Sequence, residues 1–413
     1  MKVAATGLDS VAAVRPRPEA RSLVPAEARE RSVRRRVGIA WGLLVLNSLT
    51  YYSSITHLPT SVGKSIAQAA LPVALVVALS VNRRVIVRPN VFLCLVSLLV
   101  VGALVTTLQP QHLGTIYRTV RLAEFIAALW LLTPWWGRRD MLLLRCHLVS
   151  YSVLLGSVVL GVLVAPGHAL SGGRLVGVIW FIPATEVAHY AAIVLGVVVV
   201  LWLCGHVRGR PTLAVVAGTG IILILTHTRT ALVGLVAGLL VAGLSLIVAK
   251  ARVRKLFAVA GAVTAIAIMT LSSFITAWLA RGEGAQQLSD LTGRTLVWGP
   301  LLAFPRDAFQ EIFGFGLSNG AFNGLPIDSN WLSSYEEQGL FGVVVCAAML
   351  LFLLVAAYFQ PRSVQRALAL FLITYLLIAS FTQDGFTDAS TYLLELTLAA
   401  SLLAPGLGAR RPA

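Results

Sequence analysis

Residues 339–359 read GLFGVVVCAAMLLFLLVAAYF and contain no charged side chain from end to end. A run of this length is long enough to cross the hydrocarbon core of a bilayer as an α-helix. In hydrocarbon the backbone must pair its own polar groups, which a helix does and an isolated strand does not. The whole chain shares this character, with 57% hydrophobic residues, 12% charged residues and a mean hydropathy of +0.84. The sequence therefore predicts an all-α polytopic membrane protein.

Apolar runs recur along the chain on both sides of this one. We expect about twelve transmembrane helices, at residues 37–56, 65–82, 90–108, 119–136, 148–165, 184–204, 212–226, 230–249, 256–280, 339–359, 368–382 and 391–404. A long, partly helical loop, residues 281–338, is predicted between the ninth and tenth helices. Residues 37–404 thus form one transmembrane domain. The charged residues 1–36 are expected to be a disordered basic tail, and residues 405–413 a short second tail.

The positions of Lys and Arg orient this topology, because positive residues favour cytoplasmic segments. With the N-terminus inside, 25 of the 33 Lys and Arg residues fall on cytoplasmic segments and 8 on the other side. Both termini are therefore expected in the cytoplasm, and loop 281–338 outside. The net charge of +16 then reflects topology and attraction to anionic membrane lipid. It does not indicate nucleic-acid binding, since no basic domain stands outside the membrane.

Polar residues that could carry chemistry gather in loop 281–338. Arg294 and Trp298 lie four residues apart, so on a helix they share one face and could hold a charge over a sugar or phosphate. Two prolines limit that helix to short pieces, and Trp298 by itself equally suits an anchor at the membrane interface. Asp328 could cap the helix that follows it. It could also act as a base whose pKa is raised by its apolar surroundings.

A second polar segment is THTRT, residues 226–230, between two apolar runs. An arginine at membrane depth costs about 2.5–3.5 kcal/mol at a helix centre on insertion scales, so Arg229 needs a partner. Phosphate oxygens match a guanidinium in a bidentate manner, which makes Arg229 a candidate anion ligand with His227 beside it. The alternative is that Arg229 snorkels and caps the carbonyls of the run before it.

Further arginines lie on the same predicted side. Arg174 stands in SGGRLVG, where glycines let a ligand approach the backbone, or it is a solvated arginine on a flexible loop. Arg118 and Arg121 form a further pair, which could likewise bind a ligand or be solvated. Three acids lie inside or near predicted helices: Glu124, Glu186 and Glu395. Carboxylates in such places are functional candidates, and the alternative is that they pair with these arginines or another external one. The histidines and the four cysteines have no metal-ligand spacing, so no metal site is predicted.

These motifs, in this order, resemble the O-antigen ligase and polymerase superfamily of bacterial envelope glycosyltransferases. The likeness in topology covers roughly residues 37–404. It is carried by three motifs: THTRTALVGLVAG, GRTLVWGPLL followed by GFGLSN, and DSNWLSSYEEQGLFG. In ligases the last motif typically starts with His-Asn, and polymerase-like members often have Asp-Asn. Here Asp328 and Ser329 occupy those positions.

The resemblance implies a GT-C-like glycosyltransferase of the bacterial inner membrane that works on the outer face without metal or cofactor. Its partners would be a polyprenyl-pyrophosphate-linked glycan donor, a glycan or lipid acceptor, membrane lipid and other envelope glycan assembly proteins. By resemblance Arg229 and Arg294 are catalytic residues that bind pyrophosphate, and Asp328 is the catalytic base. The expected substrate-binding residues are Arg174, Arg118, Arg121, His227, Trp298 and Asn330.

Other functions stay open on the sequence. A ligase and a polymerase share this chemistry and differ only in the acceptor, and Asp in place of His slightly favours the polymerase. An exporter or flippase of lipid-linked glycan belongs to a different class, in which broken helices at mid-membrane and repeat symmetry are usual. A purely structural envelope protein would leave loop 281–338 unexplained.

Overall fold

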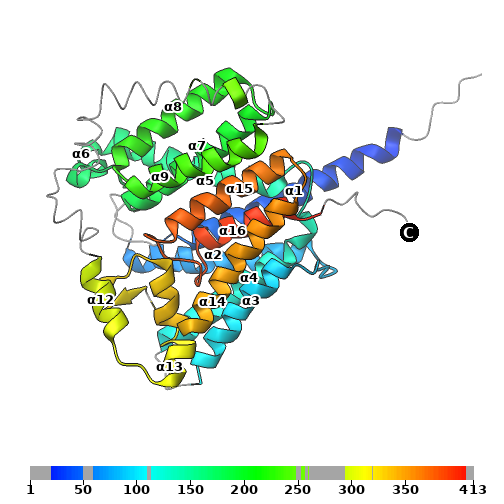
Figure 1. Cartoon of the computed structure of the whole chain (residues 1–413). Helices are drawn as coiled ribbons and strands as arrows, with labels where there is room; N and C mark the ends of the chain where they lie inside the picture. Colours follow the sequence, from blue (N-terminus) through cyan, green and yellow to red (C-terminus); the bar gives the residue numbers. More distant parts are fainter. Residues whose placement is uncertain are drawn as a thin grey trace, which may run out of the picture.

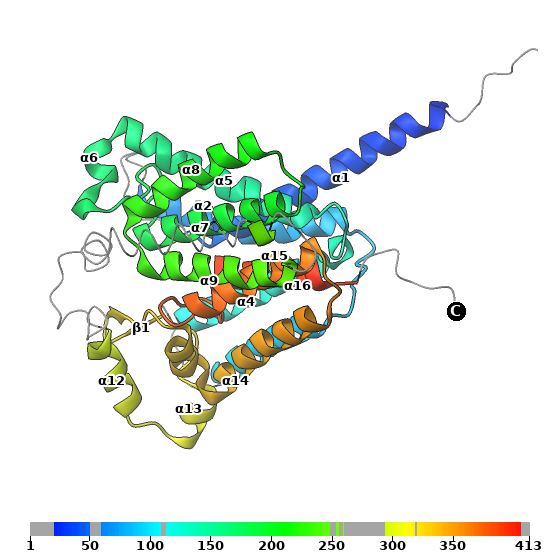
Figure 2. The same ribbon diagram turned by 45° about the horizontal axis from the view of Figure 1, so that its top comes forward.

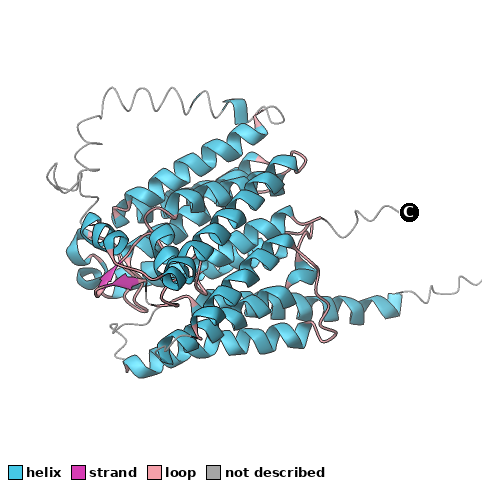
Figure 3. Ribbon diagram, turned by 60° about the horizontal axis from the view of Figure 1, so that its bottom comes forward, coloured by secondary structure: helices cyan, strands magenta, loops and turns pink. Residues whose placement is uncertain are grey.

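The computed structural model describes residues 20–49, 59–108, 113–247, 253–255, 259, 294–318 and 320–405. The helices are α1 (Ala20–Asn47), α2 (Thr60–Val81), α3 (Val91–Thr106), α4 (Leu113–Leu131), α5 (Leu142–Val164), α6 (Pro166–Ala169), α7 (Ala184–Leu203), α8 (Gly209–Thr226), α9 (Arg229–Leu246), α12 (Thr295–Ala303), α13 (Ala308–Phe313), α14 (Asn330–Phe359), α15 (Val364–Ala379) and α16 (Thr391–Leu403). There are also two 3-10 turns, η1 (Thr133–Trp135) and η2 (Ser171–Gly173), and a hairpin of β1 (Ala321–Phe322) and β2 (Leu325–Pro326). Figure 3 shows how little of the described chain is strand, so the predicted all-α class is confirmed.

Six of these helices are long and apolar enough to cross a membrane, namely α2, α5, α7, α8, α9 and α14. The apolar helices α3, α15 and α16 are shorter. Such a set of helices indicates a multi-pass membrane protein. Helices occur at eleven of the twelve predicted spans, and the remaining one, 256–280, lies outside the described residues apart from residue 259. The count of twelve spans therefore stays a prediction.

The first helix begins earlier than expected. Residues 1–36 are predicted to be disordered, yet α1 begins at Ala20 and extends beyond the bundle (Figures 1 and 2). The Ala-, Glu- and Arg-rich start of α1 has a high helix propensity. The carboxylate of Glu30 also accepts a hydrogen bond from Arg34, one turn later, at 2.9 Å. Because Arg34 lies 3.2 Å from Asp140 as well, the extension is tied to the bundle. The prediction of disorder is wrong for the helical part of this tail.

The helix α15 lies inside the bundle and packs against α9, α16 and α7 (Figures 1 and 2). Glycines on the neighbouring helices make room for its aromatic side chains. A Cβ atom on Gly196 of α7 would lie 1.9 Å from the Phe371 ring, and one on Gly238 of α9 would lie 2.8 Å from that ring. Gly234 of α9 meets Tyr375 in the same way, at 2.9 Å. Small residues let membrane helices approach closely enough for extensive van der Waals contact.

Residues 294–338, which belong to the predicted loop, form a small folded unit at one end of the bundle (Figure 1). The helix α12 and the hairpin share a core of Val297, Leu301, Phe322 and Ile327. The hairpin turns at Asn323 and Gly324, whose φ values of 51° and 80° suit the tight turn that favours this residue pair. The helices α12 and α13, the hairpin and the start of α14 lie within residues 294–338, while residue 319 and residues 281–293 lie outside the described part. The predicted loop 281–338 therefore stays a prediction.

The long helix α14 begins at Asn330 and not at 339, so the end of the predicted loop is helical. A bend at Gly339, with φ of 61°, interrupts the helix. A Cβ atom at this position would lie 2.5 Å from the Ile312 carbonyl group of α13, so a side chain would separate the two elements. The part of α14 before the bend carries Glu337, which accepts a hydrogen bond from Thr387 in the loop between α15 and α16.

Candidate active site

Arg294 and Asp328 lie together at the end of the bundle that carries α12. The Nε atom of Arg294 is 3.8 Å from Oδ2 of Asp328, and Nη2 of Arg294 donates to the carbonyl of Thr382 at 3.3 Å. Arg294 Nε is buried and makes no hydrogen bond to any described residue. Burial raises the pKa of Asp328, and the positive charge of Arg294 lowers it in part. The predicted arginine and the predicted base therefore form one ion pair.

Asp328 does not cap α14, contrary to one of the two predictions for it. Its φ is 47°, in the left-handed region, and the N-cap position belongs to Ser329. This backbone conformation, uncommon for a residue with a side chain, turns the chain between the hairpin and α14. The carboxylate is 44% exposed, which leaves Asp328 accessible beside Arg294.

Trp298 fixes α12 against the segment that carries Asp328. Its indole N–H donates to the carbonyl of Ile327 at 2.8 Å. Arg294 stands at the N-cap of α12, and its carbonyl accepts from the Trp298 backbone N–H at 3.0 Å, so the two lie one turn apart as predicted. Trp298 thus positions Arg294 and Asp328 relative to each other.

The THTRT turn is built around the end of α8. His227 adopts the left-handed conformation, with φ of 50°, and α9 begins directly at Arg229. Arg174 reaches this turn, where its Nε donates to the Thr226 carbonyl at 3.0 Å and its Nη2 donates to the Thr228 hydroxyl at 3.2 Å. Arg174 is therefore not a solvated arginine on a flexible loop. It caps α8, the task that the sequence assigns to Arg229 as an alternative.

Arg118 and Arg121 of α4 share one carboxylate, that of Asp388. Their Nη1 atoms lie 3.5 Å and 3.6 Å from its Oδ2 atom. Arg121 also donates to the side chain of Asn47 at 3.1 Å, to the backbone carbonyl of Asn47 at 2.9 Å and to the carbonyl of Ala389 at 3.4 Å. Arg121 therefore joins α1 to the loop between α15 and α16, whereas Arg118 lines a cavity.

This cavity has a volume of about 160 Å³ and is mostly polar. It lies between α4, α7, the start of α14, the α15–α16 loop and the start of α16. Its lining consists of Ser48, Arg118, Glu186, Ser318, Gly320, Ser333, Glu337, Asp384, Gly385, Thr387, Asp388, Ser390, Thr391 and Tyr392. Several carboxylates, hydroxyl groups and a guanidinium group thus face one small space, which suits a ligand rich in hydroxyl groups.

Asp384 connects the cavity to the Arg294–Asp328 pair. Burial, together with the nearby carboxylates of Asp328, Asp388 and Glu186, raises the pKa of Asp384 to about 6. Gly320, with φ of 63°, makes room for Asp384, because a Cβ atom there would lie 2.2 Å from its Oδ2 atom.

Glu337 organises the wall of the cavity next to Gly320. Its Oε1 atom accepts from the backbone N–H and the hydroxyl of Ser318, at 2.9 Å and 3.0 Å, and from the N–H of Gly320 at 3.3 Å. Ser318 and Gly320, both in the glycine-rich segment GFGLSNG, thus donate to one oxygen of the Glu337 carboxylate. Glu337 therefore has a structural task that the spacing of the motif alone does not reveal.

Residues 380–390, the loop between α15 and α16, contact several of the predicted site residues. Thr382 accepts from Arg294 through its carbonyl and donates its hydroxyl to Thr230, next to Arg229, at 2.9 Å. Asp388 holds Arg118 and Arg121. Asn330, predicted to bind substrate, is only 1% exposed, and its side-chain oxygen accepts from the backbone of Phe386 at 2.8 Å, so it holds this segment in place.

Sequence reasoning missed Asp384 and Asp388. The signal was present, because QDGFTDAS at residues 383–390 places two acids among glycine and hydroxyl residues between two apolar runs. The expected pairing of Glu186 and Glu395 with external arginines is also wrong. Glu186 accepts from the hydroxyl of Tyr392 at 3.3 Å, and Glu395 pairs with His189 at 2.8 Å.

Among the described residues no three His, Cys, Asp or Glu side chains are arranged to hold a metal ion. The chain matches no protein-family model and no curated protein sequence.

Proposed function

We propose that this protein is an O-antigen ligase-like glycosyltransferase, acting on the outer face of the bacterial inner membrane. It moves a glycan from a polyprenyl-pyrophosphate donor to an acceptor hydroxyl group. The observation that carries the proposal is the Arg294–Asp328 pair, 3.8 Å apart, beside a cavity lined by carboxylates, hydroxyls and Arg118. A fixed cation next to a carboxylate and a hydroxyl-binding space is what glycosyl transfer from a pyrophosphate requires.

In the proposed reaction the acceptor oxygen attacks the anomeric carbon of the donor sugar. Its proton passes to the carboxylate of Asp328, while the bond from the anomeric carbon to the pyrophosphate oxygen breaks. Arg294, with Arg229 at the start of α9, stabilises the negative charge on the departing polyprenyl pyrophosphate. A single displacement of this kind inverts the anomeric configuration.

Donor binding strengthens the base in this scheme. The positive charge of Arg294 holds the pKa of Asp328 below the value that burial alone gives. A pyrophosphate bound to Arg294 compensates that charge, so the Asp328 carboxylate becomes more basic when the donor is in place. The charge of Asp328 in turn raises the pKa of Asp384, so the two carboxylates lie close together.

The test is reconstitution with a polyprenyl-pyrophosphoryl glycan and an acceptor. Arg294→Ala, Arg229→Ala and Asp328→Asn should each lower transfer by about 10²-fold or more, the scale of losing an electrostatic or acid–base contribution. Arg362→Ala, at an exposed arginine between α14 and α15, is the control and should transfer normally. Normal transfer by all of the site variants would refute the proposal. A ligase and a polymerase would both pass this test, and the accepted acceptor, a lipid or a second lipid-linked glycan, distinguishes them.

An exporter of lipid-linked glycan is the second candidate, favoured by the buried pair of His189 and Glu395. Ionisable residues inside membrane helices often mark ion or proton pathways in transporters. Detergent-solubilised protein separates the two functions, because a transferase consumes the lipid-linked glycan without a bilayer and an exporter leaves it intact.

A further inference from the structure

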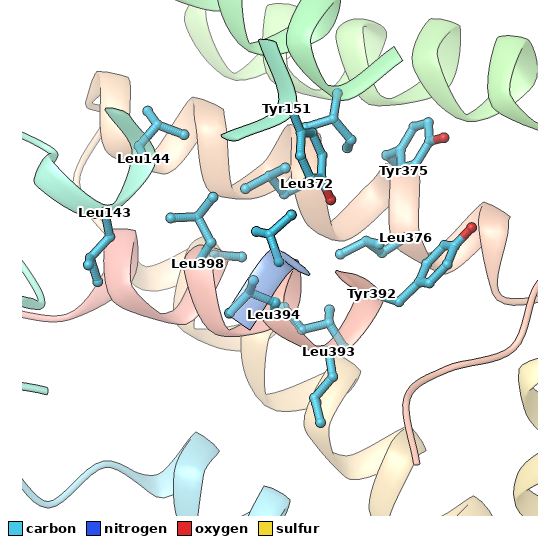
Figure 4. Close-up of a cluster of buried hydrophobic side chains, with 14 of the residues drawn as sticks. Leu143, Leu144, Tyr151, Leu372, Tyr375, Leu376, Tyr392, Leu393, Leu394 and Leu398 are labelled. Carbon is cyan, nitrogen blue, oxygen red and sulfur yellow. The ribbon is translucent and has the colours of Figure 1, made fainter. Parts of the chain in front are cut away.

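Polar side chains also meet in the interior of the helical bundle. Glu395 of α16 and His189 of α7 are 0% and 2% exposed, and Oε1 of Glu395 lies 2.8 Å from Nε2 of His189. Tyr151 of α5 donates its hydroxyl to the same carboxylate oxygen. Nε2 of His147, also on α5, lies 3.6 Å from that oxygen. Figure 4 shows Tyr151, Tyr375 and Tyr392 among buried leucine side chains.

The proton on His147 can be located from its neighbour. Nε1 of Trp41 lies 3.3 Å from Nδ1 of His147, and an indole nitrogen can only donate. Nδ1 is therefore the acceptor, and the imidazole proton is on Nε2, which faces Glu395. Tyr151 donates to Oε1 of Glu395, and the Nε2–H of His147 faces the same oxygen from 3.6 Å, so Oε1 is an acceptor. Oε2 of Glu395 is buried and has no hydrogen-bond partner among the described residues, so a proton there would lack an acceptor. The Glu395 carboxyl group is therefore ionised, and Nε2 of His189 is the donor to its Oε1 at 2.8 Å.

A buried carboxylate without a positive partner costs several kcal/mol. His147 cannot supply the charge without losing its bond from Trp41. His189 can, because its Nδ1 lies 3.1 Å from the hydroxyl of Tyr375, and a hydroxyl accepts as well as it donates. With both nitrogens protonated, His189 donates to Glu395 and to Tyr375, and the pair is neutral in total.

Among the described residues, the charged groups that act on the His189–Glu395 pair are histidines and carboxylates. The titratable groups close to the pair, in the part of the chain that the structure describes, are His147 and Tyr151 from α5, Glu186 and Tyr190 from α7, Tyr375 from α15 and Tyr392 from α16. Of the further helices packed on α16, α14 carries Glu337 in the cavity, α1 contributes Trp41 and α3 has no charged residue.

We propose that the bundle interior binds one exchangeable proton, held between His189 and Glu395 and exchanged with the polar cavity through Glu186. On uptake, the Tyr375 hydroxyl turns its hydrogen away from Nδ1 of His189, and a proton from the cavity passes by way of the Glu186 carboxylate to this nitrogen. The Tyr375 oxygen then accepts from the new N–H, and Glu186 is again ionised. Release is the reverse. The exchangeable proton does not require the proposed glycosyl transfer.

Glu186 is placed to connect the pair to the cavity. It lines the cavity, accepts from the Tyr392 hydroxyl at 3.3 Å and stands one helical turn before His189 on α7. The ring of Tyr392 packs on the imidazole of His189, with centroids 4.4 Å apart. The far side ends at Trp41, whose indole holds its proton and cannot pass one on. The site therefore exchanges with the cavity and does not conduct protons across the bundle.

The first test is nitrogen NMR of ¹⁵N-histidine-labelled protein in lipid nanodiscs, with His189→Gln to assign the signal. At pH 8 an ordinary histidine, with a pKa of about 6.5, is neutral. We expect His189 to be doubly protonated at pH 8 and to become neutral in Glu395→Gln. His147→Gln is the matched control, because it removes a neighbour and leaves the pair, so the His189 signal should stay doubly protonated. A neutral His189 at pH 8 in the wild type would overturn the proposal, whatever the variants do.

The second test concerns the route. After transfer into deuterated water, the N–H signals of His189 should exchange about 10²-fold more slowly in Glu186→Gln than in the wild type, the lower end of what a positioned proton-transfer group contributes. Equal exchange rates would overturn the role of Glu186. In proteoliposomes with a pH gradient, the wild type should leak protons no faster than Glu395→Gln. A steady proton current through the wild type alone would overturn the one-sided site.

Discussion

The hydroxyl of Thr382 lies 2.9 Å from the hydroxyl of Thr230, and this bond ties the α15–α16 loop to the start of α9. The carbonyl of the same Thr382 accepts from Arg294 at 3.3 Å. One residue therefore relates the positions of Arg229, which opens α9, and Arg294, which opens α12. The proposed function requires these two arginines, which are far apart in sequence, to act on one pyrophosphate.

Replacing Thr382 with valine tests this link. Valine keeps the shape of threonine but removes the hydroxyl, while the backbone carbonyl bonded to Arg294 remains. We expect a loss of about 0.5–1.5 kcal/mol in stability, the usual net value of one hydrogen bond, and slower glycosyl transfer because the two arginines are no longer held together. Thr382→Ser retains the hydroxyl and should behave like the wild type. Equal transfer rates for the valine and serine variants would show that the bond has no part in the reaction.

We expect Arg174 to stabilise the fold and not to take part directly in the reaction. It donates to the Thr226 carbonyl and the Thr228 hydroxyl at the end of α8. Arg174→Gln leaves the buried hydroxyl of Thr228 with one partner fewer, at an expected cost of about 1–3 kcal/mol. The thermal midpoint in detergent should fall, whereas Arg210→Gln, at an exposed arginine at the start of α8, should leave it unchanged. If Arg174→Gln abolished transfer at an unchanged midpoint, the residue would be a ligand-binding group after all.

Asp384 gives a pH dependence with a defined sign. Burial and the nearby carboxylates raise its pKa from 3.8 to about 6, so the folded protein binds this proton more tightly than the unfolded chain. The stabilising contribution is complete below about pH 3.8 and is lost as the pH rises through about 6. Asp384→Asn should therefore melt at a higher temperature than the wild type at pH 7. Its melting temperature should also change less with pH between about 3.8 and about 6.

Asp388 is the matched control in the same loop. Its carboxylate lies between Arg118 and Arg121, so Asp388→Asn leaves two guanidinium groups close together and should lower the melting temperature at pH 7. The two substitutions thus have opposite expected signs. A lower melting temperature for both at pH 7 would contradict the assignment for Asp384.

Much of the fold follows from the apolar runs, because a chain in hydrocarbon has few ways to pair its backbone. The starts of helices were harder to predict. Residues 20–36 are as charged as a disordered tail, and the contacts of Arg34 with Asp140 and of Glu30 with Arg138 show why a helix is stable there. The cap of α14 shifted from Asp328 to Ser329 because the hairpin before it imposes a left-handed residue, which composition does not reveal.

Part of the site could also be predicted, because polar residues are conspicuous in an apolar chain. Arg294 and Asp328 are two such residues, and the structure places them together. What each arginine contacts could not be derived, since several carbonyls and carboxylates compete for it in the folded protein. Arg174 caps α8, and Arg121 bonds to Asn47. The contacts of Asp388 and of the His189–Glu395 pair join parts of the chain that are far apart in sequence.

The packing around α15 gives a prediction about the fold alone. Gly196 of α7 faces the buried ring of Phe371, so Gly196→Ala should cost about 1–3 kcal/mol, the usual range for overpacking. Gly218 of α8 has nothing within 4 Å of its Cβ direction. Gly218→Ala should be neutral or stabilising, because alanine is favoured over glycine in a helix by about 1 kcal/mol. Thermal unfolding in detergent measures both, and a destabilised Gly218→Ala beside a neutral Gly196→Ala would contradict this packing.

Arg294→Lys asks whether charge alone is enough at the proposed pyrophosphate site. In the structure the guanidinium uses Nη2 for the Thr382 carbonyl and presents Nε to Asp328. A lysine ammonium is one point charge and cannot hold both directions while it binds two phosphate oxygens. Transfer by Arg294→Lys should therefore fall by about 10-fold or more, the loss of one charge-assisted hydrogen bond of about 1.5–3 kcal/mol. The double variant Asp328→Asn, Arg294→Lys should lose less transfer activity than the two single losses predict when their free energies are added, because the two side chains contact each other. Additive losses would mean that Arg294 and Asp328 act on separate steps, and wild-type transfer by Arg294→Lys would mean that a point charge suffices.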